Sequence, residues 1–130
     1  MKKIFFSICL FMYSSALLGD TLKVVYHLNE REKAGVLISS VQELLKSNPE
    51  NQIEVVIHSS AIIRLAKDGD LSTEFEGLLS KGVIIGACST SMLKNNLRPD
   101  ILIGGVVQLK QGGVLRILEL QKQGYSYIKI

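Results

Sequence analysis

Short runs of apolar and β-branched residues alternate along the chain with segments in which apolar residues recur at helical spacing. The run 83–87 contains no polar residue, a pattern typical of a strand that is covered on both faces of a sheet. Five strands separated by helices predict an α/β fold with a parallel sheet and helices on both faces. We expect strands at 22–28, 53–57, 83–87, 105–109 and 125–130, and helical segments at 34–45, 61–65, 72–79, 92–93 and 114–121.

Several polar residues and glycines are placed where helices should begin and end. Asn29 with Glu32 three residues later resembles a capping box, and Ser72 and the run 89–91 offer caps for two later helices. Gly82 and Gly124 each lie where a helix gives way to a strand. We expect both glycines to adopt a positive φ, which glycine reaches without steric penalty.

Residues 1–19 have the features of a secretory signal peptide. Lys2 and Lys3 form a charged start, 4–13 is an apolar run, and 14–16 supplies small residues for cleavage after Ala16 or Gly19. The alternative is a retained membrane anchor, but the run is shorter than the roughly 20 apolar residues that span a bilayer. We therefore expect a single domain at 20–130 in the periplasm or outside the cell, with no membrane contact after cleavage.

The composition narrows the classes of function. The chain has 130 residues, of which 47% are hydrophobic, enough for the core of one domain. Its formal charge is +3, but Lys2 and Lys3 belong to the leader, and the remainder carries thirteen basic and twelve acidic residues. A nearly neutral domain without tryptophan offers neither the electrostatics nor the stacking surface that nucleic acids require.

No common catalytic or cofactor motif is present. The glycines form neither a dinucleotide-binding loop nor a phosphate-binding P-loop, and no serine nucleophile elbow is found. Two histidines and the one cysteine outside the leader are too few for a closed zinc site. We therefore expect no metal and no cofactor.

The position of three polar residues is more informative. In open parallel sheets, ligands bind beyond the carboxyl ends of the strands, and Asn29, His58 and Cys88 follow the first, second and third predicted strands. Cys88 also precedes a predicted helix start, where backbone N–H groups favour a thiolate. A nearby imidazolium at His58 would lower the pKa of Cys88 further.

Each of these residues also has a purely structural interpretation. Cys88 can be a small, inert residue at a strand end, and His58 can simply bond a backbone carbonyl. His27 lies within the first predicted strand, which suggests a structural role or a subunit contact. The hydroxyl residues nearby are expected mainly as caps and turn residues, although their side chains can line the same crevice: Ser59, Ser60, Ser89 and Thr90.

Four segments resemble the DsrE/DsrF family of small sulfur-relay proteins. They are KVVYHLNEREKA, VVIHSSAI, LLSKGVIIGACSTSM and LELQKQGYSYIKI, which together extend over most of 22–130. The resemblance implies a three-layer α/β/α fold with a five-stranded parallel sheet, assembled as trimers or hexamers. It also implies that Cys88 matches the cysteine that carries a persulfide in some members.

The resemblance has a further consequence for the sheet. It implies that the second and third strands are neighbours, which would place His58 beside Cys88, whereas a flavodoxin-like order would place Asn29 there. One residue departs from the family pattern, because Ser59 follows His58 where a glycine is common, which would narrow the pocket.

Three functions fit these observations. The leading hypothesis is an exported sulfur carrier in which Cys88 accepts a sulfane sulfur, His58 tunes the thiolate, and the amides of Ser89 and Thr90 stabilise the persulfide. Any enzymatic activity would at most be this sulfur transfer, with sulfur-donor and sulfur-acceptor proteins as partners. The alternatives are a non-catalytic oligomeric module that binds a small ligand or partner, and a redox sensor based on oxidation of Cys88.

Overall fold

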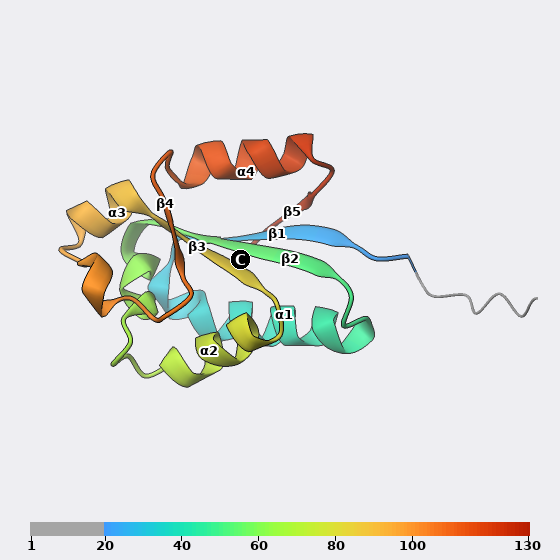
Figure 1. Ribbon diagram of the computed structural model, residues 1–130, viewed down its shortest axis with the longest axis horizontal. Helices are drawn as coiled ribbons and strands as arrows, with labels where there is room; N and C mark the ends of the chain where they lie inside the picture. Colours follow the sequence, from blue (N-terminus) through green and yellow to red (C-terminus); the bar gives the residue numbers. More distant parts are fainter. Residues whose placement is uncertain (1–19) are drawn as a thin grey trace, which may run out of the picture.

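A computed structural model describes residues 20–130 and contains a five-stranded sheet with helices on both faces (Figure 1). The predicted signal peptide lies outside the described residues. No helix within 20–130 is both long and apolar enough to cross a bilayer.

The sheet is entirely parallel and has the order β4-β3-β2-β1-β5. This confirms the predicted α/β class with five parallel strands, and the predicted neighbourhood of the second and third strands. The strands are β1 (Lys23–Leu28), β2 (Gln52–Ile57), β3 (Ile84–Cys88), β4 (Val107–Leu109) and β5 (Ser126–Lys129). The helices are α1 (Ala34–Ser47), α2 (Ser72–Ser80), α3 (Ser89–Lys94) and α4 (Gly113–Lys122), with 3-10 segments η1 (Arg31–Lys33), η2 (Ser59–Leu65) and η3 (Pro99–Ile101).

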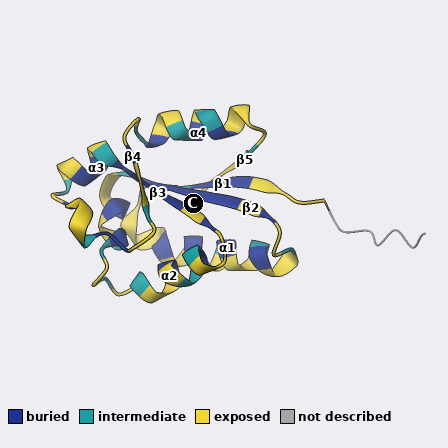
Figure 2. Cartoon of the chain, in the orientation of Figure 1, coloured by how far each residue is buried: buried dark blue, intermediate teal, exposed yellow. Residues whose placement is uncertain are grey.

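The two faces of the sheet are covered unequally. Helices α1 and α2 lie on one face, over a large core that includes Phe75, Leu37 and Ile57, all fully buried. Among the described residues, α4 is the one helix on the other face (Figure 1). Figure 2 shows the buried residues concentrated in the central strands between the two layers. The cluster under α4 is small and consists of Val25, Val56, Leu109, Ile117 and Leu120.

The helix starts differ from the predicted caps. Asn29 precedes the 3-10 segment η1, and the N–H of Lys33 bonds the carbonyl of Glu30 at 3.1 Å, so the donor needs no side-chain cap. Ser72 is the first residue of α2 rather than its cap, and its N–H bonds the carbonyl of Gly69. Ser89 likewise opens α3, whose cap position is held by Cys88. At the first two starts, a tight turn of backbone satisfies donors for which side chains were expected, whereas at α3 the N–H groups of Thr90 and Ser91 donate to the Cys88 side chain.

The two helix-ending glycines do adopt the predicted conformation, with φ of 87° at Gly82 and 90° at Gly124. A Cβ at either position would meet no neighbouring atom within 4 Å, so the cost of a side chain there is conformational only.

We predict that Gly82→Ala and Gly124→Ala each lower the free energy of unfolding by about 1 kcal/mol, because an L-residue is strained at positive φ. Gly77→Ala is the matched control, since Gly77 lies inside α2 with free space around it and alanine there should stabilise by up to about 1 kcal/mol. Urea denaturation measures all three. Equal effects of the three substitutions would contradict the conformational explanation.

Candidate functional site

The carboxyl ends of the three central strands bring the predicted site residues to one edge of the sheet. β2 pairs with β1 on one side and with β3 on the other, and its last pairs are Leu28↔Ile57 and Ile57↔Ala87. His58 and Cys88 therefore end adjacent strands at the same level. Asn29 ends β1, on the far side of β2, so it is not the neighbour of Cys88.

Cys88 is a free cysteine with 7% of its surface exposed. Burial raises the pKa of its thiol, but hydrogen bonds from the Ser91 hydroxyl and from the N–H groups of Ser91, Gly113 and Thr90 outweigh this effect. The pKa of Cys88 consequently lies below its ordinary value, which is the direction expected from its place before a helix. The sequence predicted the amides of Ser89 and Thr90 as donors to Cys88. Thr90 is one of the donors, but Ser91 and Gly113 donate in place of Ser89.

A hydrogen-bond chain orients the Ser91 hydroxyl. The N–H of Ser59 donates to Ser91 Oγ at 2.9 Å, which leaves the hydroxyl proton for Cys88. Asn95 secures both residues, since its side-chain amide donates to the carbonyls of Ser91 at 2.8 Å and Ser59 at 3.3 Å. Ser59 has φ of 53°, in the region that favours glycine, and this conformation aims its N–H at Ser91.

The start of α4 approaches the sheet very closely at Gly113. A Cβ on this residue would lie 3.0 Å from His58 Nδ1, 3.1 Å from Val56 Cγ1 and 3.6 Å from Cys88 Cβ. Glycine therefore permits the contact that brings the Gly113 N–H to the thiol.

An ion pair on the same face fixes α4 in this position. Arg116, one turn into the helix, forms two hydrogen bonds to Glu54 on β2, at 2.7 and 2.9 Å. Glu54 is only 2% exposed, so removal of either partner would leave an uncompensated charge under the helix.

The two histidines lie on this same face and contact each other. His27 Nε2 is 3.1 Å from His58 Nε2 and 3.3 Å from His58 Nδ1, and His27 Nδ1 is 2.6 Å from the hydroxyl of Tyr127 on β5. Burial, the neighbouring His58 and Lys129 lower the pKa of His27 to about 4. Burial and Lys129 lower the pKa of His58 too.

His58 therefore affects Cys88 differently from what the sequence led us to expect. Its lowered pKa makes it a neutral imidazole at neutral pH, so it does not act on the thiolate as an imidazolium. The hydrogen bonds of the hydroxyl and the amides, rather than a positive charge, lower the pKa of Cys88.

The remaining predicted residues lie at the edge of this arrangement. The Asn29 carbonyl accepts a 3.4 Å hydrogen bond from the Ser60 hydroxyl, and Asn29 Oδ1 is buried without a hydrogen-bond partner among the described residues. Within 20–130, no group of three or more histidine, cysteine or acidic side chains is placed to hold a metal ion.

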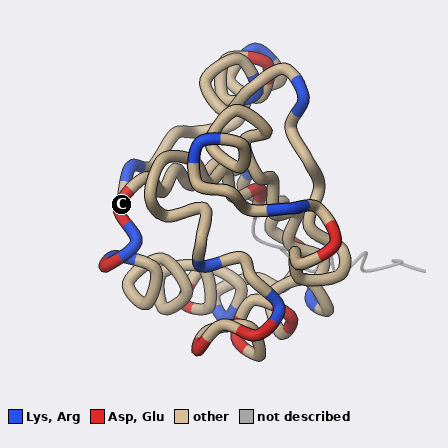
Figure 3. Tube along the Cα trace, turned by 90° about the vertical axis from the view of Figure 1, so that its left-hand side faces the viewer, with Lys and Arg blue, Asp and Glu red and all other residues tan. Residues whose placement is uncertain are grey.

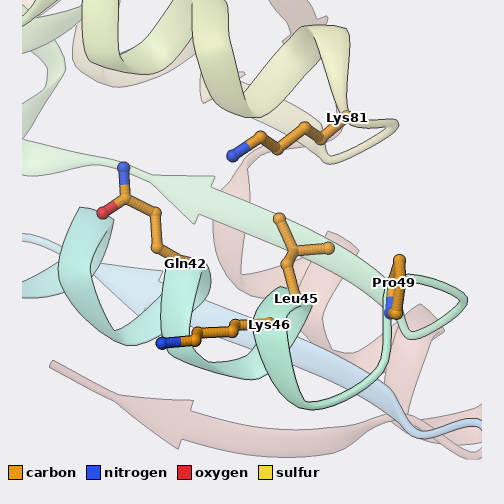
Figure 4. A pocket seen from close by; sticks show the side chains of 5 residues that line it. All are labelled: Gln42, Leu45, Lys46, Pro49 and Lys81. Carbon is orange, nitrogen blue, oxygen red and sulfur yellow. The ribbon is translucent and has the colours of Figure 1, made fainter.

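Two other features lie apart from this site. A hollow of about 530 Å³ is lined by residues of α1 and the turns after α1 and α2, among them Lys46 and Lys81 (Figure 4). These turns lead into β2 and β3, so the hollow is at the amino edge of the sheet, away from Cys88. Basic and acidic residues are interspersed along the described chain (Figure 3), in keeping with its near-neutral charge.

The lowered pKa values of the histidines predict how stability depends on pH. A histidine whose pKa falls from 6.5 to about 4 on folding stabilises the folded chain above pH 6.5, and this contribution is lost as the pH falls towards 4. We expect the free energy of unfolding, measured in urea, to fall over this window and to fall much less in His27→Gln. A native chain of constant stability from pH 6.5 to about 4 would contradict the burial of neutral imidazoles.

Comparisons with known proteins identify relatives by structure. No protein-family model and no curated protein sequence matches the chain. The protein of unknown function MTH1491 from Methanobacterium thermoautotrophicum is 30% identical, and the match covers 84% of this chain and 99% of that protein, with a TM-score of 0.78.

Two further solved structures share the fold at lower identity. The ychN protein from E. coli is 15% identical, with a TM-score of 0.71 and coverage of 85% of this chain and 100% of that protein. The conserved protein of unknown function BT1422 from Bacteroides thetaiotaomicron is 19% identical, with a TM-score of 0.69 and coverage of 83% and 94%. Because the MTH1491 match combines 30% identity with nearly complete coverage, this chain belongs to the same family as MTH1491, a protein of unknown function.

Proposed function

We propose that this chain is an exported, DsrE-like sulfur carrier that holds a sulfane sulfur as a persulfide on Cys88. The observation that carries the proposal is the position of Cys88, which ends β3 at the carboxyl edge of a parallel sheet and precedes α3, where hydrogen-bond donors lower its pKa. Attack on sulfur requires the thiolate, and three backbone N–H groups and one hydroxyl converge on this side chain to favour it.

The transfer needs no external oxidant or reductant. The Cys88 thiolate attacks the outer sulfur of a donor R–S–SH, an Sγ–S bond forms, and the donor's S–S bond breaks. Its electron pair leaves with the donor as R–S⁻, so Cys88–S⁻ and R–S–SH become Cys88–S–SH and R–S⁻. The reverse exchange passes the sulfur to an acceptor thiolate.

The hydrogen-bond donors around Cys88 can stabilise the negative charge of both the thiolate and the persulfide anion. Amide N–H groups of Thr90, Ser91 and Gly113 are fixed dipoles that stabilise a sulfur anion without bringing a counter-charge. His58 lies beside this group as a neutral imidazole, able to donate or accept a proton. The proposed sites are thus Cys88 as the carrier and His58 as its acid–base neighbour.

The low exposure of Cys88 is the observation that favours an alternative function, a non-catalytic binding module. A thiol that is 7% exposed is also what a non-catalytic binding module would contain, with the edge of the sheet serving only to hold a ligand. Reactivity separates the two functions, because a binding module tolerates Cys88→Ser.

We predict that mature protein treated with polysulfide gains about 32 Da, one sulfur atom, on the peptide that contains Cys88. Mass spectrometry measures the gain, dithiothreitol should remove it, and Cys88→Ser should show none. If the folded protein gains no sulfur and resists alkylation while the urea-unfolded protein is alkylated, the carrier function is excluded and the binding module replaces it.

We further propose that the chain acts as a homo-oligomer, a trimer or hexamer, in the periplasm or outside the cell. Large apolar side chains remain exposed on the single chain, among them Leu93 (81%) on α3 and Val114 (64%) on α4. Contacts between copies would cover such surface. Light scattering of the mature protein at micromolar concentration should give a mass of three or six chains, and a monomer would contradict the proposal.

A further inference from the structure

A hollow of about 210 Å³ lies between α4 and the side of the sheet that β1 and β5 form. His27 on β1 and Tyr127 on β5 line it from the sheet. The helix lines it with side chains that recur at helical spacing and are mostly apolar, namely Val114, Ile117, Leu118 and Gln121. The hollow is therefore apolar along most of the helix and polar along the sheet.

The hollow lies where the topology of the sheet favours a ligand site. β2, β3 and β4 extend from β1 in one direction, whereas β5 lies on the other side of β1. Ligand sites of open α/β sheets are found preferentially where the strand order reverses in this way. The hollow also adjoins the surroundings of Cys88, because Val114 directly follows Gly113, whose N–H donates to the thiol.

A hydrogen-bonded row leaves one donor for the hollow. The hydroxyl of Tyr127 is 2.6 Å from His27 Nδ1, and His27 Nε2 is 3.1 Å from His58 Nε2. With the His27 proton on Nδ1, His58 donates to His27 and His27 donates to the Tyr127 oxygen. The O–H of Tyr127, a residue that is 42% exposed, is then available to an acceptor in the hollow.

The electrostatic potential beside the hollow is positive. Lys129 follows Tyr127 by two residues on β5, so both side chains are on the same face of the sheet. Burial lowers the pKa of both imidazoles, and the charge of Lys129 lowers both further, while its ammonium also donates to the backbone oxygen of Ile130. None of the described residues that line the hollow is acidic.

We propose that this hollow binds a small, weakly hydrated sulfur anion, the inorganic polysulfide from which Cys88 takes its sulfur. This inference rests on the proposed sulfur-carrier function and names its substrate class. The Tyr127 O–H and the Gln121 amide donate to the anion, and the apolar side chains of α4 contact its polarisable sulfur chain. Binding moves no electron or proton, and the exchange at Cys88 is the one given above, with a sulfur chain as R.

The size and the polarity of the hollow exclude other classes of ligand. Its volume is below the roughly 300–1,000 Å³ of sites for drug-sized molecules, so a nucleotide does not fit. Strongly hydrated anions such as sulfate would exchange a full hydration shell for two donors and an apolar wall, which is costly. A weakly hydrated anion loses much less on entering.

Thiocyanate is a suitable probe, because it is a small, weakly hydrated sulfur anion that does not load Cys88 with sulfur. We expect a titration of the mature protein at constant ionic strength, followed by NMR, to shift the signals of Val114, Leu118 and the Gln121 amide along a saturable curve. Sulfate should give no saturable shift. Cys88→Ser should bind thiocyanate like the native chain, since the thiol does not line the hollow.

Two substitutions test the groups that hold the anion. Tyr127→Phe should weaken thiocyanate binding about tenfold, as expected for the loss of a hydrogen bond to a charged group. Lys129→Gln should weaken it about threefold, because an exposed charge contributes less. The matched controls, Tyr125→Phe and Lys110→Gln, should bind normally, because neither residue lines the hollow and Lys110 follows β4 at the opposite edge of the sheet.

Sulfur loading provides a second measurement. Tyr127→Phe should raise the polysulfide concentration that gives half the maximal loading rate of Cys88 by about tenfold and leave the maximal rate unchanged, since it removes ground-state binding. Thiocyanate should compete with polysulfide in the native chain. Tyr125→Phe should behave like the native chain in both respects.

The outcomes separate this inference from the proposed function. Thiocyanate shifts that do not saturate, or equal binding and loading in Tyr127→Phe and the native chain, would overturn the anion site even if Cys88 gains sulfur. Saturable thiocyanate binding that depends on Tyr127, in a protein whose Cys88 gains no sulfur, would support the anion site and overturn the carrier function.

Discussion

The close approach of Gly113 to the carboxyl edge of the sheet is the constraint on which the rest of the site depends. A Cβ at this position would lie 3.0 Å from His58 Nδ1 and 3.1 Å from Val56 Cγ1, tighter than ordinary side-chain contacts, so glycine is the residue that fits this approach without displacing them. The approach delivers an N–H to Cys88 and places the start of α4 against His58. The ion pair between Arg116 and the buried Glu54 connects the helix to β2, beside a small apolar cluster.

Dipoles rather than charges set the acidity of Cys88. Backbone amides from two helix starts and the oriented Ser91 hydroxyl outweigh the cost of burying the thiol, while the nearest histidine is neutral. Fixed dipoles are screened by salt less than surface charges are, and they stabilise an anion without binding it as an ion pair. A carrier must both take up and release its sulfur, and such surroundings stabilise the thiolate and the persulfide anion alike.

The overall fold was predictable because its signals are local. Apolar runs such as 83–87 and the glycines at 82 and 124 indicate strands and helix ends through backbone preferences that hold in any context. Chain order then placed Cys88 and His58 at strand ends. Their adjacency follows from the strand order β3-β2, which the family resemblance implied and the residues alone left open.

The chemistry around Cys88 was less predictable because it arises between distant segments. The hydrogen bond from Gly113 to Cys88, the Ser59–Ser91 hydrogen bond and the contacts of His27 with His58 and Tyr127 join residues from 25 to 100 positions apart. No local pattern encodes these distances. The pair 112–113 before a helix was the only local sign of the close approach. The expected caps at Asn29 and Ser72 failed for a related reason, because tight backbone turns supplied acceptors that a sequence pattern does not reveal. At Ser89, the helix begins one residue earlier than expected, with Cys88 in the cap position.

The pKa of Cys88 is the quantity that tests this account most directly. The rate of iodoacetamide alkylation of the folded mature protein, followed against pH, reports it, since only the thiolate reacts. The account predicts a midpoint below the free-cysteine value of about 8.5, because hydrogen bonds outweigh burial. A midpoint at or above that value would show that burial prevails, and it would contradict the central claim that this edge of the sheet is built to hold a thiolate.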